Sequence, residues 1–172
     1  MSTRAKLITI LSIVAVLIVA ALLYFVPRST PVDLSFHVVK LDKNGYDLGT
    51  AQVRIQGEML DYLFQESRLD AEIELADKAA DICLINGKNG PDEISCTEVN
   101  GYQLLRLAGY FYDKQADTSA FLDIVFTEEM DRFVFYLPQD KVYYVGSASG
   151  SYDTLGVLDY FNSIAPNLAP ER

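Results

Sequence analysis

Tryptophan is absent from this chain of 172 residues, histidine occurs once, as His37, and cysteine twice, as Cys83 and Cys96. Catalysis by a Ser–His or Cys–His pair would therefore have to use His37, and no G-x-S-x-G nucleophile elbow accompanies it. A phosphate-binding loop of G-x-x-x-x-G-K-[ST] type and a C-x-x-C redox pair are absent from the sequence as well. We therefore expect His37 to be a structural or surface residue, and we assign no catalytic residue, no cofactor and no metal site.

Positive charge is scarce in most of the chain. All 24 acidic residues and 12 of the 14 basic residues follow Pro27, because only Arg4 and Lys6 precede it, so this part carries a net charge near −12. Such a charge excludes nucleic acid and anionic lipid headgroups as partners that are held by charge. An acidic surface also keeps a protein soluble, so simple solvation and the selection of cationic partners are equal alternatives here.

The apolar stretch at the N-terminal end predicts a membrane helix. Leu7–Val26 comprises 20 residues without a charged side chain. Because a helix rises about 1.5 Å per residue, the stretch reaches about 30 Å, which is the thickness of a hydrocarbon core. Arg4, Lys6 and the terminal amine precede it and only Arg28 follows closely, which favours a cytoplasmic N-terminus. We expect a single-pass helix in the cell membrane, with the rest of the chain extracytoplasmic.

A cleaved signal peptide is the alternative interpretation of this stretch. Signal peptides usually have about 7–15 apolar residues followed by small residues at the cleavage site. Here the run is longer and ends in the bulky residues of LLYFVP, which favours a retained anchor. The expected organisation is a cytoplasmic stub at 1–6, the membrane helix at 7–26, a spacer at 28–33, a β-rich domain at 34–165 and a flexible tail at 166–172.

The domain after the spacer has the composition of strands. Tyrosine, phenylalanine and β-branched residues dominate the segments between turns that contain Gly and Asn. Alternating and apolar runs predict about nine strands, near 33–39, 51–59, 68–75, 81–86, 94–99, 102–112, 120–126, 132–137 and 141–145. A helix is expected at 152–165, capped by Asp153 or Thr154, because apolar residues recur there at helical spacing: Leu155, Leu158, Phe161 and Ile164.

Several of these strands are apolar on both faces, such as FVFYL at 133–137 and VYYV at 142–145. A strand that is buried on both faces needs a cover, which is either a second sheet layer or a helix. Strand–helix alternation of the doubly wound α/β kind is absent from the pattern. We therefore predict an all-β domain, an antiparallel sandwich or barrel with one C-terminal helix, preceded by the transmembrane helix.

The sequence suggests two hairpin turns and, for the second of them, the register in which the strands pair. Asn44–Gly45 is a favoured hairpin dipeptide. A tight hairpin about residues 65–68 would pair Phe64 with Leu69, and with them Tyr62 with Ala71 and Leu60 with Ile73. This register pairs even-numbered with odd-numbered residues, whereas the inward residues earlier in 51–59 are odd-numbered. The strand must then change face, and Gly57 is the expected site of a β-bulge.

The segment CLINGKNGPDEISC contains both cysteines. A symmetric hairpin would place Cys83 opposite Cys96, which makes this pair a candidate disulfide. A bridge that closes a loop of this length would stabilise the fold by about 3 kcal/mol, and an extracytoplasmic location would permit its oxidation. Two buried free thiols are an equal alternative. Zinc would need three or four close ligands, and His37 is distant in sequence.

The acidic and glycine-rich segments give only weak signals of a site. Asp70, Glu72 and Glu74 are typical of a solvated strand face, and residues 128–131 of a polar turn. The DKNGYD segment at 42–47 lacks the spacing of a calcium loop and predicts a hairpin turn. The GSASGSYD segment at 146–153 could bind an anion before the helix but is better interpreted as a connector. The tyrosines could present platforms for a sugar or peptide, although a role in the core is favoured.

Three functions remain, and they belong to different classes. The favoured one is a ligand- or protein-binding module of a cell envelope, with an envelope protein or glycan as partner and the membrane as its anchor. The first alternative is an envelope-polymer hydrolase that uses a carboxylate pair, which would need a cleft with one raised carboxyl pKa. The second is a small structural subunit of a membrane complex, which would need an exposed apolar patch.

Overall fold

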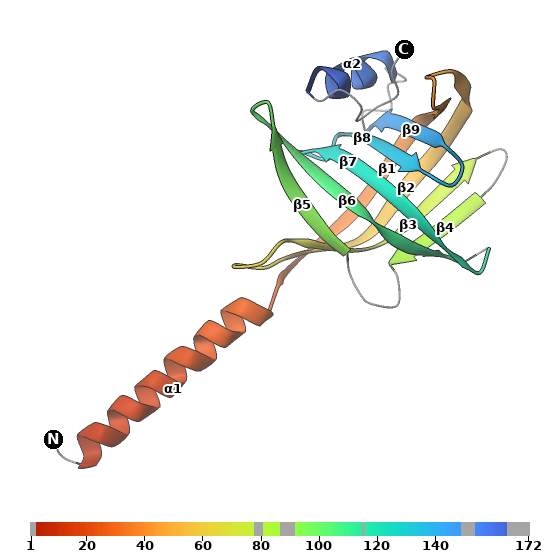
Figure 1. The fold of residues 1–172 in the computed structure, drawn as a ribbon. Helices are drawn as coiled ribbons and strands as arrows, with labels where there is room; N and C mark the ends of the chain where they lie inside the picture. The colour runs from red at the N-terminus through yellow and green to blue at the C-terminus, as the bar shows by residue number, and fades with distance from the viewer. Residues whose placement is uncertain (1–2, 78–80, 87–91, 115, 149–153, 165–172) are drawn as a thin grey trace.

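The computed structural model describes residues 3–77, 81–86, 92–114, 116–148 and 154–164. Figure 1 shows a long N-terminal helix that extends away from a β-barrel, with a short helix on the outside of the barrel. The elements are α1 (Thr3–Phe25), β1 (Arg28–Asp42), β2 (Asp47–Asp61), β3 (Arg68–Asp77), β4 (Asp81–Asn86), β5 (Asp92–Val99), β6 (Tyr102–Asp113), β7 (Thr118–Thr127), β8 (Arg132–Leu137), β9 (Val142–Ser147) and α2 (Thr154–Ile164).

The nine strands of the described residues form one antiparallel sheet that closes on itself. The barrel closes where β9 pairs with β1, from Asp42 opposite Val142 to His37 opposite Ser147. β4 and β5 share one position in the wall. β4 pairs with the second half of β3 and the end of β6, and β5 pairs with the beginnings of the same two strands. The result is a closed barrel with eight strand positions, which confirms the prediction of an antiparallel barrel-like domain with a C-terminal helix.

Alternating side chains fill the barrel interior. The residues predicted to face inward along β3 are all in this core, namely Leu69, Ala71, Ile73 and Leu75. Aromatic rings supply much of its bulk, and five of them are fully buried: Phe36, Phe111, Phe126, Phe133 and Phe135. The interior of an eight-stranded barrel is just wide enough for side chains to fill it. The two-residue alternation read from the sequence therefore assigned the inward face of these strands correctly.

α2 covers the outer surface of one part of the barrel wall. Its buried residues are Val157, Leu158, Phe161 and Ile164, and they pack on outward side chains of five strands: Val39, Leu41, Leu104, Val125, Val134 and Val145. This packing explains why β8 and β9 are apolar on both faces, as expected for covered strands. Leu155, expected on the packed face, is instead 52% exposed. The expected cap Asp153 lies outside the described residues, and Thr154 is the first residue of the helix.

The β2–β3 hairpin has a different register from the one expected. Met59 pairs with Leu69 and Gly57 pairs with Ala71, so odd-numbered residues face inward on both strands. The connecting segment spans residues 62–67 and is longer than the tight turn that the prediction assumed. Because no change of face is needed, the predicted bulge at Gly57 is wrong.

Gly57 serves a close approach between strands instead. A Cβ atom at this position would overlap the carbonyl oxygen of Asp70 and would lie 2.6 Å from the Cα atom of Ala71, so only glycine fits here. The shift of register that the structure does contain lies between Lys40 and Leu41 of β1, close to the β1–β2 turn.

The segment before the barrel is a helix of membrane-spanning character. Leu7–Phe25 is long and apolar enough to cross a membrane, and none of its residues is buried by the rest of the chain. A membrane anchor and a signal sequence both fit this helix by length and composition. β1 begins at Arg28, so the residues expected to be a spacer, 28–33, are already paired with β2. The tail expected at 166–172 lies outside the described residues.

The cysteine hairpin is not formed. β4 and β5 do not pair with each other but follow one another along the same wall position. Cys83 lies opposite Glu74 of β3, whereas Cys96 lies opposite Leu105 of β6. Both cysteines are free thiols, so the candidate disulfide between them is not seen in this structure. The alternative of two buried free thiols is met only in part, because Cys83 is partly buried and Cys96 is exposed. The symmetric register was wrong because both strands find their partners in β3 and β6.

Candidate functional site

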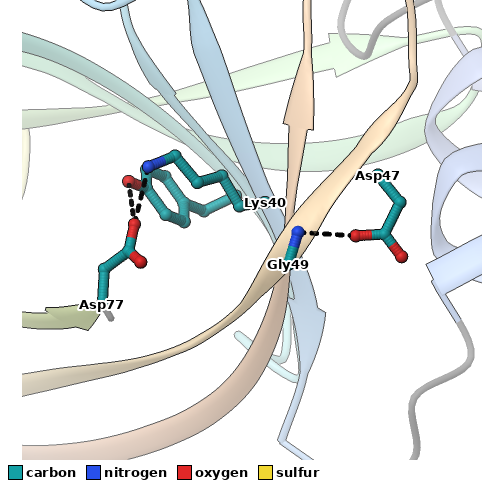
Figure 2. Close-up of polar contacts among 5 residues, drawn as sticks. Lys40, Asp47, Gly49 and Asp77 are labelled. Atoms are coloured by element: carbon teal, nitrogen blue, oxygen red, sulfur yellow. Dashed lines mark hydrogen bonds and ion pairs between the residues drawn. The ribbon is translucent and has the colours of Figure 1, made fainter. Parts of the chain in front are cut away.

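A polar cluster lies inside the barrel near the end that carries the β1–β2 turn. The Nζ atom of Lys40 lies 2.6 Å from Oδ2 of Asp77, and the Tyr144 hydroxyl donates to the same oxygen at 3.3 Å. Figure 2 shows Lys40 and Asp77 facing each other, with Asp47 and Gly49 joined at the beginning of β2. The ammonium group also lies 5.7 Å from the ring centroid of Tyr144. Three strands that are distant in sequence thus bring a cation, a carboxylate and a phenol together.

The pKa shifts in this cluster set its protonation at neutral pH. Burial lowers the pKa of the Lys40 ammonium, but the hydrogen bond to Asp77 and the electrostatic interactions with Tyr144 and Asp77 outweigh this effect, so the net pKa is raised. Burial raises the pKa of Tyr144 as well. A protonated ammonium and a neutral phenol are neither bases nor nucleophiles. The cluster is a largely buried ion pair that joins β1 to β3 at this end of the barrel.

A second cluster surrounds Cys83 on the outer surface. Its Sγ atom donates to Oε1 of Glu72 at 2.7 Å, and Nζ of Lys114 lies 2.8 Å from Oε2 of the same carboxylate. Burial, followed by the hydrogen bond to Glu72, raises the pKa of Cys83 to about 11. The hydrogen bonds from Cys83 and Lys114 lower the pKa of Glu72. Because the thiolate is the nucleophile and the metal ligand, a thiol held protonated in this way is poorly reactive.

The remaining candidates from the sequence lie apart from one another. His37 is exposed on the outer face of β1. The carboxylate of Asp42 accepts hydrogen bonds from the backbone N–H groups of Asn44 and Tyr46, both at 2.8 Å, which confirms the predicted hairpin turn. Over the described ranges, no group of three or more His, Cys, Asp and Glu side chains is placed to hold a metal ion. The connector predicted at 146–153 is described only as far as Ala148.

A hollow of about 570 Å³ lies on the outside of the barrel, and we call it the α2 groove. It lies between α2, the β5–β6 turn and the β7–β8 turn, and its lining residues are Gly101, Tyr102, Gln103, Thr127, Glu128, Glu129, Asp131, Arg132 and Tyr160. The β5–β6 turn is a two-residue hairpin in which Asn100 and Gly101 have φ values of 51° and 82°. The side-chain amide of Asn100 donates to the carbonyl oxygen of Ile164 at 2.5 Å, which ties this turn to the end of α2.

The acidic wall of the α2 groove is the β7–β8 turn. The hydroxyl of Thr127 donates to Oδ1 of Asp131 at 2.5 Å and accepts from the backbone N–H of the same residue at 3.2 Å. Met130 has a φ value of 54°, a conformation that this network holds in place. Glu128 and Glu129 are exposed at the tip of the turn. The turn therefore presents carboxylates toward the groove from a backbone fixed by its own hydrogen bonds.

The opposite wall of the α2 groove is aromatic. The rings of Tyr102 and Tyr160 meet edge to face, with centroids 6.0 Å apart. The guanidinium carbon of Arg132 lies 4.9 Å from the centroid of the Tyr160 ring. One ring face in the groove therefore already accepts a guanidinium group, in the geometry of a cation–π contact. Carboxylates beside aromatic rings suit a lysine or arginine side chain of a partner.

Local sequence patterns do not reveal this groove. Glu128, Glu129 and Asp131 are typical of a polar turn, and nothing in their spacing connects them with Tyr102 or Tyr160. The only local signal was the Asn–Gly dipeptide at 100–101, which indicates a hairpin directly before Tyr102. The approach of α2 to both turns depends on tertiary packing. No protein-family model, no curated protein and no solved structure matches the chain, so the groove is interpreted from its own geometry.

Proposed function

We propose that the protein is a single-pass membrane protein of the cell envelope whose acidic barrel lies outside the cytoplasm and binds a cationic segment of an envelope protein. The observation that carries this proposal is the α2 groove, which combines carboxylates and tyrosine rings on the outside of a barrel whose interior is filled by side chains. Binding at the outer surface is the arrangement that such a barrel permits.

The anchoring part of the proposal is supported by α1. Its apolar segment is uncovered, and an uncovered helix of this length suits a hydrocarbon core, where it satisfies its own backbone hydrogen bonds. The two basic residues before the segment favour a cytoplasmic N-terminus. The long run with bulky residues at its end favours retention over cleavage.

Binding is favoured over catalysis by the titratable clusters. Lys40 is held as an ammonium ion and Cys83 as a thiol, so two groups that could act as nucleophiles are in their unreactive forms. The pKa of Glu72 is lowered, which is the wrong direction for a general acid. Arg132 of the α2 groove already pairs with Asp131 at 3.8 Å and lies on the Tyr160 ring. Glu128, Glu129 and the ring of Tyr102 are the groups that could recognise the cation of a partner without any reaction.

The proposal is tested with the full-length protein in detergent micelles and a fluorescent arginine-rich peptide. We expect binding that weakens as salt is added. The double variant E128Q/E129Q should weaken it by about 2- to 30-fold, because each exposed ion pair contributes about 0.2–1 kcal/mol. The matched control is D70N/E74Q, which removes the same charge from the exposed outer face of β3.

The comparison of the two double variants shows whether the α2 groove binds the peptide. A large loss with E128Q/E129Q and a small loss with D70N/E74Q supports the groove as the binding site. Equal losses would show that the net charge of the barrel attracts the peptide and that the groove has no special role. An affinity that neither variant changes would show that these carboxylates do not bind the peptide and would contradict the groove as a cation-binding site.

A further inference from the structure

We propose that the tip of the β2–β3 hairpin, residues 62–66, is a second membrane contact that lies in the lipid headgroup interface beside the end of α1. The inference rests on the proposed anchoring by α1 and concerns how the barrel is oriented on the bilayer. The partner is the zwitterionic surface of the bilayer itself.

The hairpin tip is joined to the end of the membrane helix. The side-chain amide of Gln65 donates to the backbone carbonyl oxygen of Tyr24 at 2.9 Å. The rings of Phe64 and Tyr24 are stacked, with centroids 6.4 Å apart and an interplanar angle of 19°. Figure 1 shows the β2–β3 hairpin projecting from the barrel toward the end of α1. The tip and the last turn of α1 therefore lie at the same level.

The tip has two adjacent exposed apolar side chains where a turn would ordinarily be polar. Leu63 and Phe64 are adjacent and are 63% and 65% exposed. Turns favour Gly, Asn, Asp and Ser, and the β5–β6 turn of this barrel follows that rule with Asn100 and Gly101. Exposed apolar side chains that are continuous with an apolar helix indicate a shared environment. Phe25, the last residue of α1, is exposed to a similar extent, at 68%.

The depth of the tip follows from the length of α1. The segment Leu7–Phe25 has 19 residues, and at about 1.5 Å per residue it spans about 28 Å, close to the thickness of a hydrocarbon core. Tyr24 and Phe25 then lie at the boundary between acyl chains and headgroups, where aromatic side chains are enriched. A side chain stacked on Tyr24 must lie at that boundary too.

The polar residues around the tip are placed to remain in the headgroup layer. Asp61 accepts a hydrogen bond from the Ser67 hydroxyl at 2.7 Å, which closes the base of the loop. The guanidinium carbon of Arg68 lies 5.8 Å from the ring centroid of Tyr62, and the Nη2 atom of Arg68 lies 3.0 Å from Oε1 of Glu93. Leu63 and Phe64 are the exposed apolar residues of the tip. Glu66, at the other end of the tip, is exposed and carries a carboxylate that would have to stay in the headgroup layer as well. Two contacts, α1 and the tip, would restrict rotation of the barrel, with α2 on the side of the barrel away from α1 (Figure 1).

The test uses the absence of tryptophan from the chain. In the variant F64W, the single tryptophan reports on the hairpin tip. In the control Y46W, it reports on the β1–β2 turn, where Tyr46 is 70% exposed and lies at the other end of the barrel wall. Both full-length variants are reconstituted into phosphatidylcholine vesicles, with and without brominated acyl chains, and their association with the vesicles is measured by flotation.

We expect brominated lipid to lower the emission of F64W at least about twofold, because an interfacial ring lies within reach of the acyl chains. Y46W should be unaffected by bromination. The variant L63W repeats the measurement at the neighbouring exposed position and should behave as F64W does. Such a result would place the tip in the interface.

Flotation tests the anchoring by α1, and quenching by brominated lipid tests the membrane contact of the tip. If the protein floats with the vesicles but the tip tryptophans and Y46W are equally insensitive to bromination, the tip is in water and the inference is overturned, while the anchor stands. If the protein does not float, the anchoring by α1 is contradicted, and the membrane contact of the tip with it.

Discussion

Cys83 is held as a protonated thiol by its surroundings, and this protonation state can be measured directly. Burial and the hydrogen bond to Glu72 raise its pKa from 9.0 to about 11. A disulfide reagent reacts only with the thiolate. We therefore expect Cys83 of the folded protein to react more slowly at pH 8 than Cys83 of the protein unfolded in urea, and we expect its reaction to follow a pH midpoint near the raised pKa.

The size of the effect follows from two opposing contributions. A pKa higher by about 2 units lowers the thiolate fraction at pH 8 by about 100-fold. A thiolate of higher pKa is also a better nucleophile, with a Brønsted slope of about 0.4–0.5, which offsets about 8-fold of the loss. The folded-state reaction should therefore be about 10-fold slower than that of the unfolded chain. Because the loss of thiolate is the larger contribution, we expect the fold to slow the reaction of Cys83 with the reagent.

The assay is the pH dependence of the reaction with an aromatic disulfide, followed for each cysteine by mass spectrometry of its peptide. The variant E72Q removes the hydrogen-bonding carboxylate and should accelerate Cys83 by several-fold, although burial will keep the pKa above its ordinary value. The variant E74Q is the matched control, since Glu74 contributes the smallest of the charge effects on Cys83. It should change the rate little.

Two results would refute this reasoning. A midpoint for Cys83 at or below pH 9 would show that Glu72 does not hold the thiol protonated. The absence of any adduct on both Cys83 and Cys96 would show that they are bridged, in contradiction to the strand pairing. The same pKa shift carries a stability consequence of defined sign: because the folded-state pKa exceeds the unfolded value, the contribution of this thiol is present below about pH 9 and is lost as the pH rises through about 11.

Two further predictions concern the stability of the barrel and are measured by urea unfolding of the full-length protein in micelles. Phe161→Ala removes a fully buried ring from under α2 and should lower the free energy of unfolding by about 3–5 kcal/mol. Leu155→Ala, at a half-exposed position of the same helix, should lower it much less. Similar losses for the two variants would contradict the packing of α2. Gly57→Ala places a methyl group against the backbone of β3 and should cost about 1–3 kcal/mol or more. An unchanged midpoint would show that β2 and β3 do not approach as described.

Local patterns in the sequence were sufficient for the elements and their faces. The strands predicted at 68–75, 81–86 and 132–137 coincide with β3, β4 and β8 to within two residues. Alternation has a period of two residues and depends only on neighbouring positions, so it identifies the inward face without knowledge of the partner strand. The apolarity of β8 on both faces also required a cover, which α2 provides.

Local sequence patterns did not predict the strand register or the strand order. The hairpin proposed for 83–96 failed because β4 and β5 pair with β3 and β6 rather than with each other. The bulge expected at Gly57 failed because the register depends on the length of the β2–β3 connection, which residue preferences did not reveal. Both errors concern the choice of partner, which is decided by competition among all strands.

The sequence by itself determined an apolar N-terminal helix, an acidic all-β domain and an amphipathic C-terminal helix, because each of these is a property of consecutive residues. Only the tertiary structure decided that β9 closes on β1, that Lys40 meets Asp77 inside the barrel, and that Tyr160 approaches the β7–β8 turn. These contacts join residues far apart in the chain, and they form because closing the barrel and covering its wall bury the most apolar surface together. The candidate site consists of such contacts between distant residues, so local sequence patterns could not predict it.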